Sequence, residues 1–138
     1  MEFEWIYRLL ESPRLYLLAR ILLTLTFWLS GITKLFDFGG AMAETAAPGL
    51  PAPALFAVLT ILVQLIGSAL VIYGGNLVWL GAGALGVFTA ATIVLAHPFW
   101  ATEGAAAKLN LTIAAEHVSV IGGLVVASIL ARRQHIQQ

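Results

Sequence analysis

Four long apolar stretches dominate the sequence and limit what the chain can fold into. They run from about Leu15 to Phe36, from Ala54 to Tyr73, from Leu77 to Ala96 and from Leu111 to Ala131. Each holds about 20 residues, which lets a helix rising about 1.5 Å per residue cross about 30 Å of hydrocarbon. The sequence therefore predicts one all-α integral membrane domain over residues 1–138, folded as a four-transmembrane-helix bundle.

The charge content leads to the same fold class. Hydrophobic residues make up 60% of the 138 residues and charged residues only 10%, whereas soluble domains average about 25% charged residues. In water such a chain would expose a large apolar patch, which soluble monomers avoid. The formal net charge of zero lacks the basic surplus that nucleic-acid binding needs. We therefore expect the lipid bilayer, and not nucleic acid, as the partner.

Segments outside the four spans also carry structural signals. The opening segment MEFEWIYRLLE alternates apolar and charged side chains at helical spacing, which predicts an N-terminal interfacial amphipathic helix that ends at Pro13. Residues 40–47 can form a short interfacial helix, because the prolines that follow stop any longer one. Between the second and third spans, residues 74–76 leave room only for a tight hairpin.

Basic residues predict the orientation, because cytoplasmic segments carry an excess of lysine and arginine. The two longer loops are flanked only by Lys34 and Lys108. Five arginines lie near the two ends of the chain: Arg8, Arg14, Arg20, Arg132 and Arg133. We therefore expect both termini in the cytoplasm and the longer loops outside. Arg20 lies within the first span, where its side chain either reaches the headgroups or belongs to a site.

Small residues spaced four apart predict where the helices meet, because they let two backbones approach closely in a membrane. The third span holds one such stripe and the fourth span another: Ala82, Gly86 and Ala90, and Ser119, Gly123 and Ala127. Such stripes favour packing within the bundle over contact with another subunit.

Ionisable side chains near membrane depth are costly and mark candidate functional sites. Lys34 and Asp37 close the first span at i,i+3 spacing, so we expect them to pair across a helical turn. His97 ends the third span, and Glu116 and His117 enter the fourth span from the same side. The topology therefore predicts that these five residues lie in one outer layer of the bundle.

Two interpretations of this outer layer stay open. A carboxylate with imidazoles can carry protons or hydrogen-bond a quinone carbonyl. Alternatively, a self-contained polar cluster locks the helices together, with a salt bridge from Lys34 to Glu116. A metal site is disfavoured, because the two histidines lack i,i+4 spacing and no complete ligand set is visible. Gln64, near the middle of the second span, needs a partner on another helix or on a ligand.

The sequence offers no complete catalytic constellation. The chain has no cysteine, so thiol and disulfide chemistry within it is excluded. We identify no activated serine and no loop that cradles phosphate. We therefore expect no catalysis by this chain on its own, and any reaction would depend on a bound cofactor or a partner protein.

The order of these features resembles the DoxX family of small bacterial membrane proteins. The similarity extends from about residue 14 to residue 130 and is fairly specific as an ordered set. It rests on six segments: Arg20–Leu23, Ser30–Leu35, Gly49–Leu55, Gln64–Gly67, His97–Trp100 and Ile121–Leu124. Many members carry a glutamate where this chain has Gln64, which removes an ionisable group from the second span.

The resemblance implies a four-helix bundle in the bacterial inner membrane and a link to membrane redox chemistry. Relatives include a subunit of thiosulfate:quinone oxidoreductase and partners of secreted oxidative-stress enzymes. The leading interpretation is an accessory subunit of a redox assembly, with a membrane or periplasmic partner protein and a quinone as the candidate cofactor. The alternatives are a stand-alone binding or transport protein for a small apolar ligand, and a purely structural membrane subunit.

Overall fold

Helices make up most of residues 3–136, the part of the chain that the computed structural model describes. The α-helices are α1 (Glu4–Leu10), α2 (Pro13–Leu23), α3 (Leu25–Phe36), α4 (Phe38–Ala46), α5 (Pro53–Tyr73), α6 (Val78–Ala96) and α7 (Gly104–Ile136). Two short 3-10 helices, η1 (Gly75–Leu77) and η2 (Phe99–Ala101), precede α6 and α7. Helices α5, α6 and α7 are long and apolar enough to cross a membrane, and α2 with α3 forms a fourth span when the bent pair counts as one. The predicted all-α membrane bundle is confirmed.

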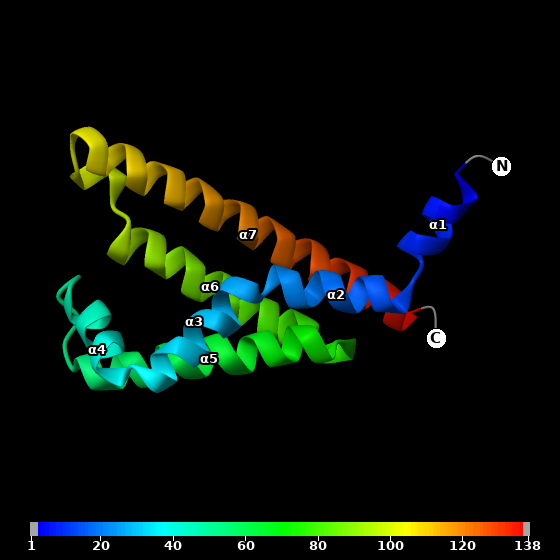
Figure 1. Ribbon diagram of the computed structural model, residues 1–138, viewed down its shortest axis with the longest axis horizontal. Helices are drawn as coiled ribbons and strands as arrows, with labels where there is room; N and C mark the ends of the chain where they lie inside the picture. The colour runs from blue at the N-terminus through cyan, green and yellow to red at the C-terminus, as the bar shows by residue number, and fades with distance from the viewer. Residues whose placement is uncertain (1–2, 137–138) are drawn as a thin grey trace.

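The two chain ends lie at one end of the bundle (Figure 1). We call this the terminal end; it also holds the turn from α5 to α6. The opposite end, which we call the loop end, holds α4 and η2 (Figure 1). Large apolar side chains on the outer faces of the long helices are exposed, so the bundle presents an apolar surface to lipid.

Helix α1 stands apart from the bundle at the terminal end, and none of its residues is buried (Figure 1). It ends at Leu10, before the proline that was expected to end it. Pro13 instead begins α2 as its first residue. Proline suits this position, because the first helical N–H has no partner within the helix in any case.

The first span is bent by 54° at the break between α2 and α3. Thr24 occupies the break and is fully buried. Its hydroxyl donates to the backbone oxygen of Arg20 at 2.8 Å, and Trp28 Nε1 donates to the backbone oxygen of Ile21 at 3.2 Å. A threonine hydroxyl that bonds back to the preceding turn favours bending. This bend has no signal in the sequence, because neither proline nor glycine stands there.

Helices α5 and α6 cross in close contact at two glycines. A Cβ added at Gly81 would lie 2.6 Å from the backbone oxygen of Gly67, and one added at Gly67 would lie 2.8 Å from Leu85 Cγ. Leu85 and Val71 are fully buried beside this crossing. Two glycines thus let the backbones approach closely, which favours van der Waals packing between helices in lipid.

The predicted stripes of small residues coincide with these contacts only in part. On α6, Ala82 is buried, but a Cβ added at Gly86 would meet no atom within 4 Å. On α7, Ala127 is buried and a Cβ added at Gly123 would lie 2.8 Å from Leu23 Cδ1, whereas Ser119 is exposed. The prediction was wrong for Gly86, because the contact face of α6 is centred on Gly81.

Arg20 caps the C-terminal end of α5. Its Nη1 donates to the backbone oxygen of Val71 at 3.3 Å, and its guanidinium lies 4.5 Å from the centre of the Tyr16 ring. A cation at a helix C-terminus is favoured by the helix dipole, and stacking on an aromatic ring adds to this. Arg20 therefore contacts α5 through a guanidinium nitrogen and Tyr16 through the face of the guanidinium group.

Gly74 makes room for this arginine. It adopts φ 90° and ψ −160°, a conformation essentially restricted to glycine, and an added Cβ would overlap Arg20 Nη1. We predict that Gly74→Ala lowers the free energy of unfolding by about 2–3 kcal/mol. Gly75→Ala is the matched control, because Gly75 has φ 69° with nothing near an added Cβ; its loss is expected near 1 kcal/mol. Equal losses in a denaturation titration would contradict the proposed contact with Arg20.

Candidate functional site

A cavity of about 750 Å³ lies among α3, α5, α6 and α7 towards the loop end. Its volume falls within the range of about 300–1,000 Å³ that is typical of small-molecule pockets. Most of the lining is apolar, with the rings of Phe27, Phe56 and Phe88 among the walls. The hydrogen-bonding and charged side chains in the lining include Ser30, Lys34, Glu44, Gln64, His97 and His117. We call this space the loop-end cavity.

Lys34 is the cation of the loop-end cavity. Its Nζ lies 2.8 Å from Glu44 Oε2 and donates to Ser30 Oγ at 2.8 Å. The Lys34 side chain is only 13% exposed, whereas that of Glu44 is 64% exposed. The buried ammonium thus relies on a carboxylate at the cavity mouth. Neither expected partner of Lys34 is used, since it pairs with Glu44 instead of Asp37 or Glu116.

Gln64 on α5 is buried and lines the cavity opposite α3. It is 5% exposed, and its Nε2 donates to Ser30 Oγ at 3.2 Å. Its Oε1 has no hydrogen-bond partner within residues 3–136, and neither does Ser68 Oγ one helical turn further along α5. Because buried polar atoms are nearly always hydrogen-bonded, the free acceptor of Gln64 marks a position where a ligand donor can bind.

Ser30 links these groups into one hydrogen-bonded chain. The order is Glu44, Lys34, Ser30 and Gln64, and it runs from an exposed carboxylate at the mouth to a buried carboxamide. Three helices contribute to it: α4, α3 and α5. The chain gives the apolar cavity one polar wall with a fixed arrangement of donors and acceptors.

Two imidazoles line the cavity, one from the residue that caps the C-terminal end of α6 and one from α7. The rings of His97 and His117 meet edge to face with their centres 5.4 Å apart. His97 Nδ1 also lies 3.4 Å from Asn110 Oδ1. Each ring is half-buried, so both can bind a ligand that reaches this side of the cavity.

Two members of the predicted outer layer lie outside the cavity. Asp37 is exposed and caps α4, its Oδ1 accepting from the backbone N–H of Gly40 at 2.9 Å. Glu116 is exposed on α7, because consecutive helical residues point about 100° apart and His117 takes the inward direction. The prediction of one outer layer was therefore wrong for Asp37 and Glu116. Lys34, His97 and His117 do line one cavity, together with the buried Gln64.

Glu44 and Ser30 are functional candidates that the sequence analysis missed. Glu44 is the only acidic residue of α4, and a lone acid in a short interfacial helix near a lysine was a usable signal. Ser30 gave none, because serine is common in membrane helices. Within the described part of the chain, no group of three or more His, Asp or Glu side chains is placed to hold a metal ion.

Comparison with known proteins places the chain in a family. The family model for DoxX matches residues 15–98, which include most of α2, all of α3 to α6 and the polar wall of the cavity. The chain is 29% identical over 117 residues to inner membrane protein YphA of Escherichia coli (strain K12), covering 85% of this chain and 83% of that protein. No solved structure matches the chain. With its apolar spanning helices, the chain is therefore a multi-pass membrane protein that belongs to the DoxX family.

Proposed function

We propose that the protein binds a quinone-type molecule in the loop-end cavity and serves as an accessory subunit of a redox assembly in the bacterial inner membrane. The observation that carries the proposal is the cavity itself, about 750 Å³ with apolar walls and one polar side. A quinone matches this pattern, because its ring and tail are apolar and its polar atoms are two oxygens. The resemblance to redox-linked relatives supplies the class of ligand.

The polar wall can hydrogen-bond both redox forms of such a molecule. The Lys34 ammonium has three N–H donors and uses two of them on Glu44 and Ser30. Its third N–H can donate to a quinone carbonyl. Gln64 Oε1, which lacks a partner within residues 3–136, can accept from a quinol hydroxyl. The imidazoles of His97 and His117 can each donate one hydrogen bond and accept another.

The accessory role is inferred from what the chain supplies. It provides binding and hydrogen-bonding groups but no cysteine, so electrons must come from a cofactor or from a partner. The location is inferred from the named relative, inner membrane protein YphA. The arginines at the terminal end favour cytoplasmic termini, which would place the mouth of the loop-end cavity on the periplasmic side.

Purification from native membranes in a mild detergent tests both parts of the proposal. Organic extraction followed by mass spectrometry should recover a quinone, and native mass spectrometry should detect a partner subunit. A quinone without a partner would favour the alternative, a stand-alone binding protein. Recovery of the chain with neither would contradict the proposal and favour a structural subunit.

Gln64→Leu is expected to weaken binding of a short-chain quinol about tenfold, because a hydrogen bond in a buried site is lost. Binding is measured by isothermal titration calorimetry of the purified protein in detergent. The matched control is Gln134→Leu, the same change at an exposed position of α7 outside the cavity. If both variants bind as the wild type does, Gln64 does not contact the ligand.

A further inference from the structure

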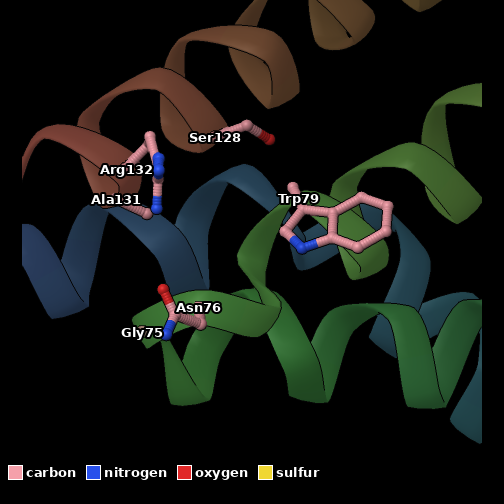
Figure 2. A pocket seen from close by; sticks show the side chains of 6 residues that line it. All are labelled: Gly75, Asn76, Trp79, Ser128, Ala131 and Arg132. Carbon is pink, nitrogen blue, oxygen red and sulfur yellow. The ribbon is translucent and has the colours of Figure 1, made fainter. Parts of the chain in front are cut away.

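A second cavity lies at the opposite end of the molecule. It has a volume of about 400 Å³ and opens between the start of α6 and the end of α7 (Figure 2). Its lining consists of Gly75, Asn76, Trp79, Ser128, Ala131 and Arg132. None of these residues lines the loop-end cavity. We call this second space the terminal-end cavity; it has no part in the proposed quinone binding.

The terminal-end cavity carries a positive charge that no neighbouring acid balances. Arg132 is exposed and forms no salt bridge among residues 3–136. The sequence from residue 104 to the end has one acidic residue, Glu116, and residues 45–102 have none. The remaining acids of the terminal end lie ahead of Pro13, where Glu4 pairs with Arg8 at 3.6 Å. An anion in the cavity would therefore meet little repulsion from α5, α6 or α7.

The hydrogen-bond donors of this cavity come from Arg132 and Trp79, whereas the Ser128 hydroxyl donates to the backbone oxygen of Leu124 at 3.0 Å and the Asn76 oxygen faces Arg132 (Figure 2). Figure 2 shows the indole nitrogen of Trp79 on the side of the ring that faces Asn76 and Arg132. Arginine offers five N–H donors in a planar fork that fits phosphate oxygens. Asn76 Nδ2 lies 3.2 Å from His135 Nε2, which brings a further basic side chain to the rim. Phosphate oxygens accept hydrogen bonds and match this donor set.

The position of the cavity suits a lipid headgroup. It lies beside the turn from α5 to α6 and near the C-terminal end of α7, where the apolar spans end (Figure 1). Tryptophan and arginine at such a depth are typical of the membrane interface. Gly83 and Gly86 follow on the same side of α6 as Trp79, and a Cβ added at either would meet nothing within 4 Å. The outside of α6 is therefore open along the path that an acyl chain would take.

We propose that the terminal-end cavity binds the phosphate headgroup of an anionic phospholipid, with one acyl chain along α6 at Gly83 and Gly86. Arg132 supplies the charge and N–H donors, and Trp79 supplies an N–H donor and an apolar ring. A basic pocket between membrane helices is a general means of recognising anionic headgroups. The lipid would hold the start of α6 and the end of α7 together.

The test is native mass spectrometry of the full-length protein in detergent with added lipid. The probes are phosphatidylglycerol, phosphatidylcholine and inorganic phosphate at matched concentrations. We expect retention of phosphatidylglycerol, and about five- to tenfold weaker retention for Arg132→Gln. Arg133→Gln is the matched control, because Arg133 does not line the cavity; its retention should stay within about twofold of the wild type.

Three outcomes would overturn the proposal. Equal retention of phosphatidylcholine would show that the headgroup charge is not recognised. Equal losses for the two arginine variants would show a diffuse charge effect without a site. Displacement of the lipid by an equal concentration of inorganic phosphate would show an anion site that does not select a lipid. Thermal unfolding of both variants checks that each is folded before binding is compared.

Discussion

Gly81→Val is expected to lower the free energy of unfolding by about 3 kcal/mol, the upper end of the usual cost of overpacking. A Cβ at this position would lie 2.6 Å from the backbone oxygen of Gly67 and 2.7 Å from Leu70 Cβ. These atoms belong to the backbone and to the root of a side chain, so no rotamer change relieves the contact. Helices α5 and α6 must separate, and Leu85 then loses part of its packing.

Gly83→Val provides the control for this expectation. Gly83 lies on the same helix, and an added Cβ there meets nothing within 4 Å. The substitution has the same effect on helix propensity without the steric contact. Denaturant titration in detergent micelles, followed by circular dichroism, should show a large loss for Gly81→Val and a change below about 1 kcal/mol for Gly83→Val. Similar losses in both variants would mean that the crossing tolerates separation.

The ion pair of the loop-end cavity leads to an asymmetric expectation. Glu44→Gln should lower the free energy of unfolding by about 2 kcal/mol, because it leaves a mostly buried ammonium without its counter-charge. This is less than the about 3–5 kcal/mol of a fully buried pair, since Glu44 is largely exposed. Lys34→Met should cost less than about 1 kcal/mol, because the remaining carboxylate of Glu44 stays in contact with water.

A double-mutant cycle measures the coupling between these two side chains. The variant with both Glu44→Gln and Lys34→Met should be more stable than Glu44→Gln alone, since the uncompensated charge is gone. The control is Glu103→Gln, an exposed acid near the loop end with no salt bridge among the described residues; it should change stability by less than about 0.5 kcal/mol. Additive losses in the cycle would contradict the ion pair.

The fold class could be predicted from the sequence because the apolar stretches are long and the charges are few. The bend within the first span and the helix faces that meet could not be predicted from the sequence. Thr24 lies at the bend of the first span and its hydroxyl bonds back to Arg20, but threonine is too common in membrane helices to signal a bend. Likewise, the period of the small residues on α6 suggested Gly86, whereas the contact lies at Gly81.

The sequence predicted at which end of the bundle the candidate site lies, but it did not predict the contacts within the site. The i,i+3 pairing of Lys34 with Asp37 assumed one continuous helix. In the structure α3 ends at Phe36, and Asp37 has φ −126° and ψ 71°, so its carboxylate turns to α4. Glu44 reaches Lys34 only because α4 packs back against α3 and α5. A contact between distant parts of the chain has no local sequence signal.

The hydrogen-bonded chain from Gln64 to Glu44 links a buried carboxamide to a largely exposed carboxylate. A partner protein that draws the Glu44 carboxylate away would leave the Lys34 ammonium without its counter-charge. The ammonium would then form a stronger hydrogen bond to a carbonyl bound in the cavity. Conversely, a ligand that engages Lys34 would loosen Glu44 for such a partner. By thermodynamic linkage, the partner and the ligand would change each other's binding free energy by the same amount.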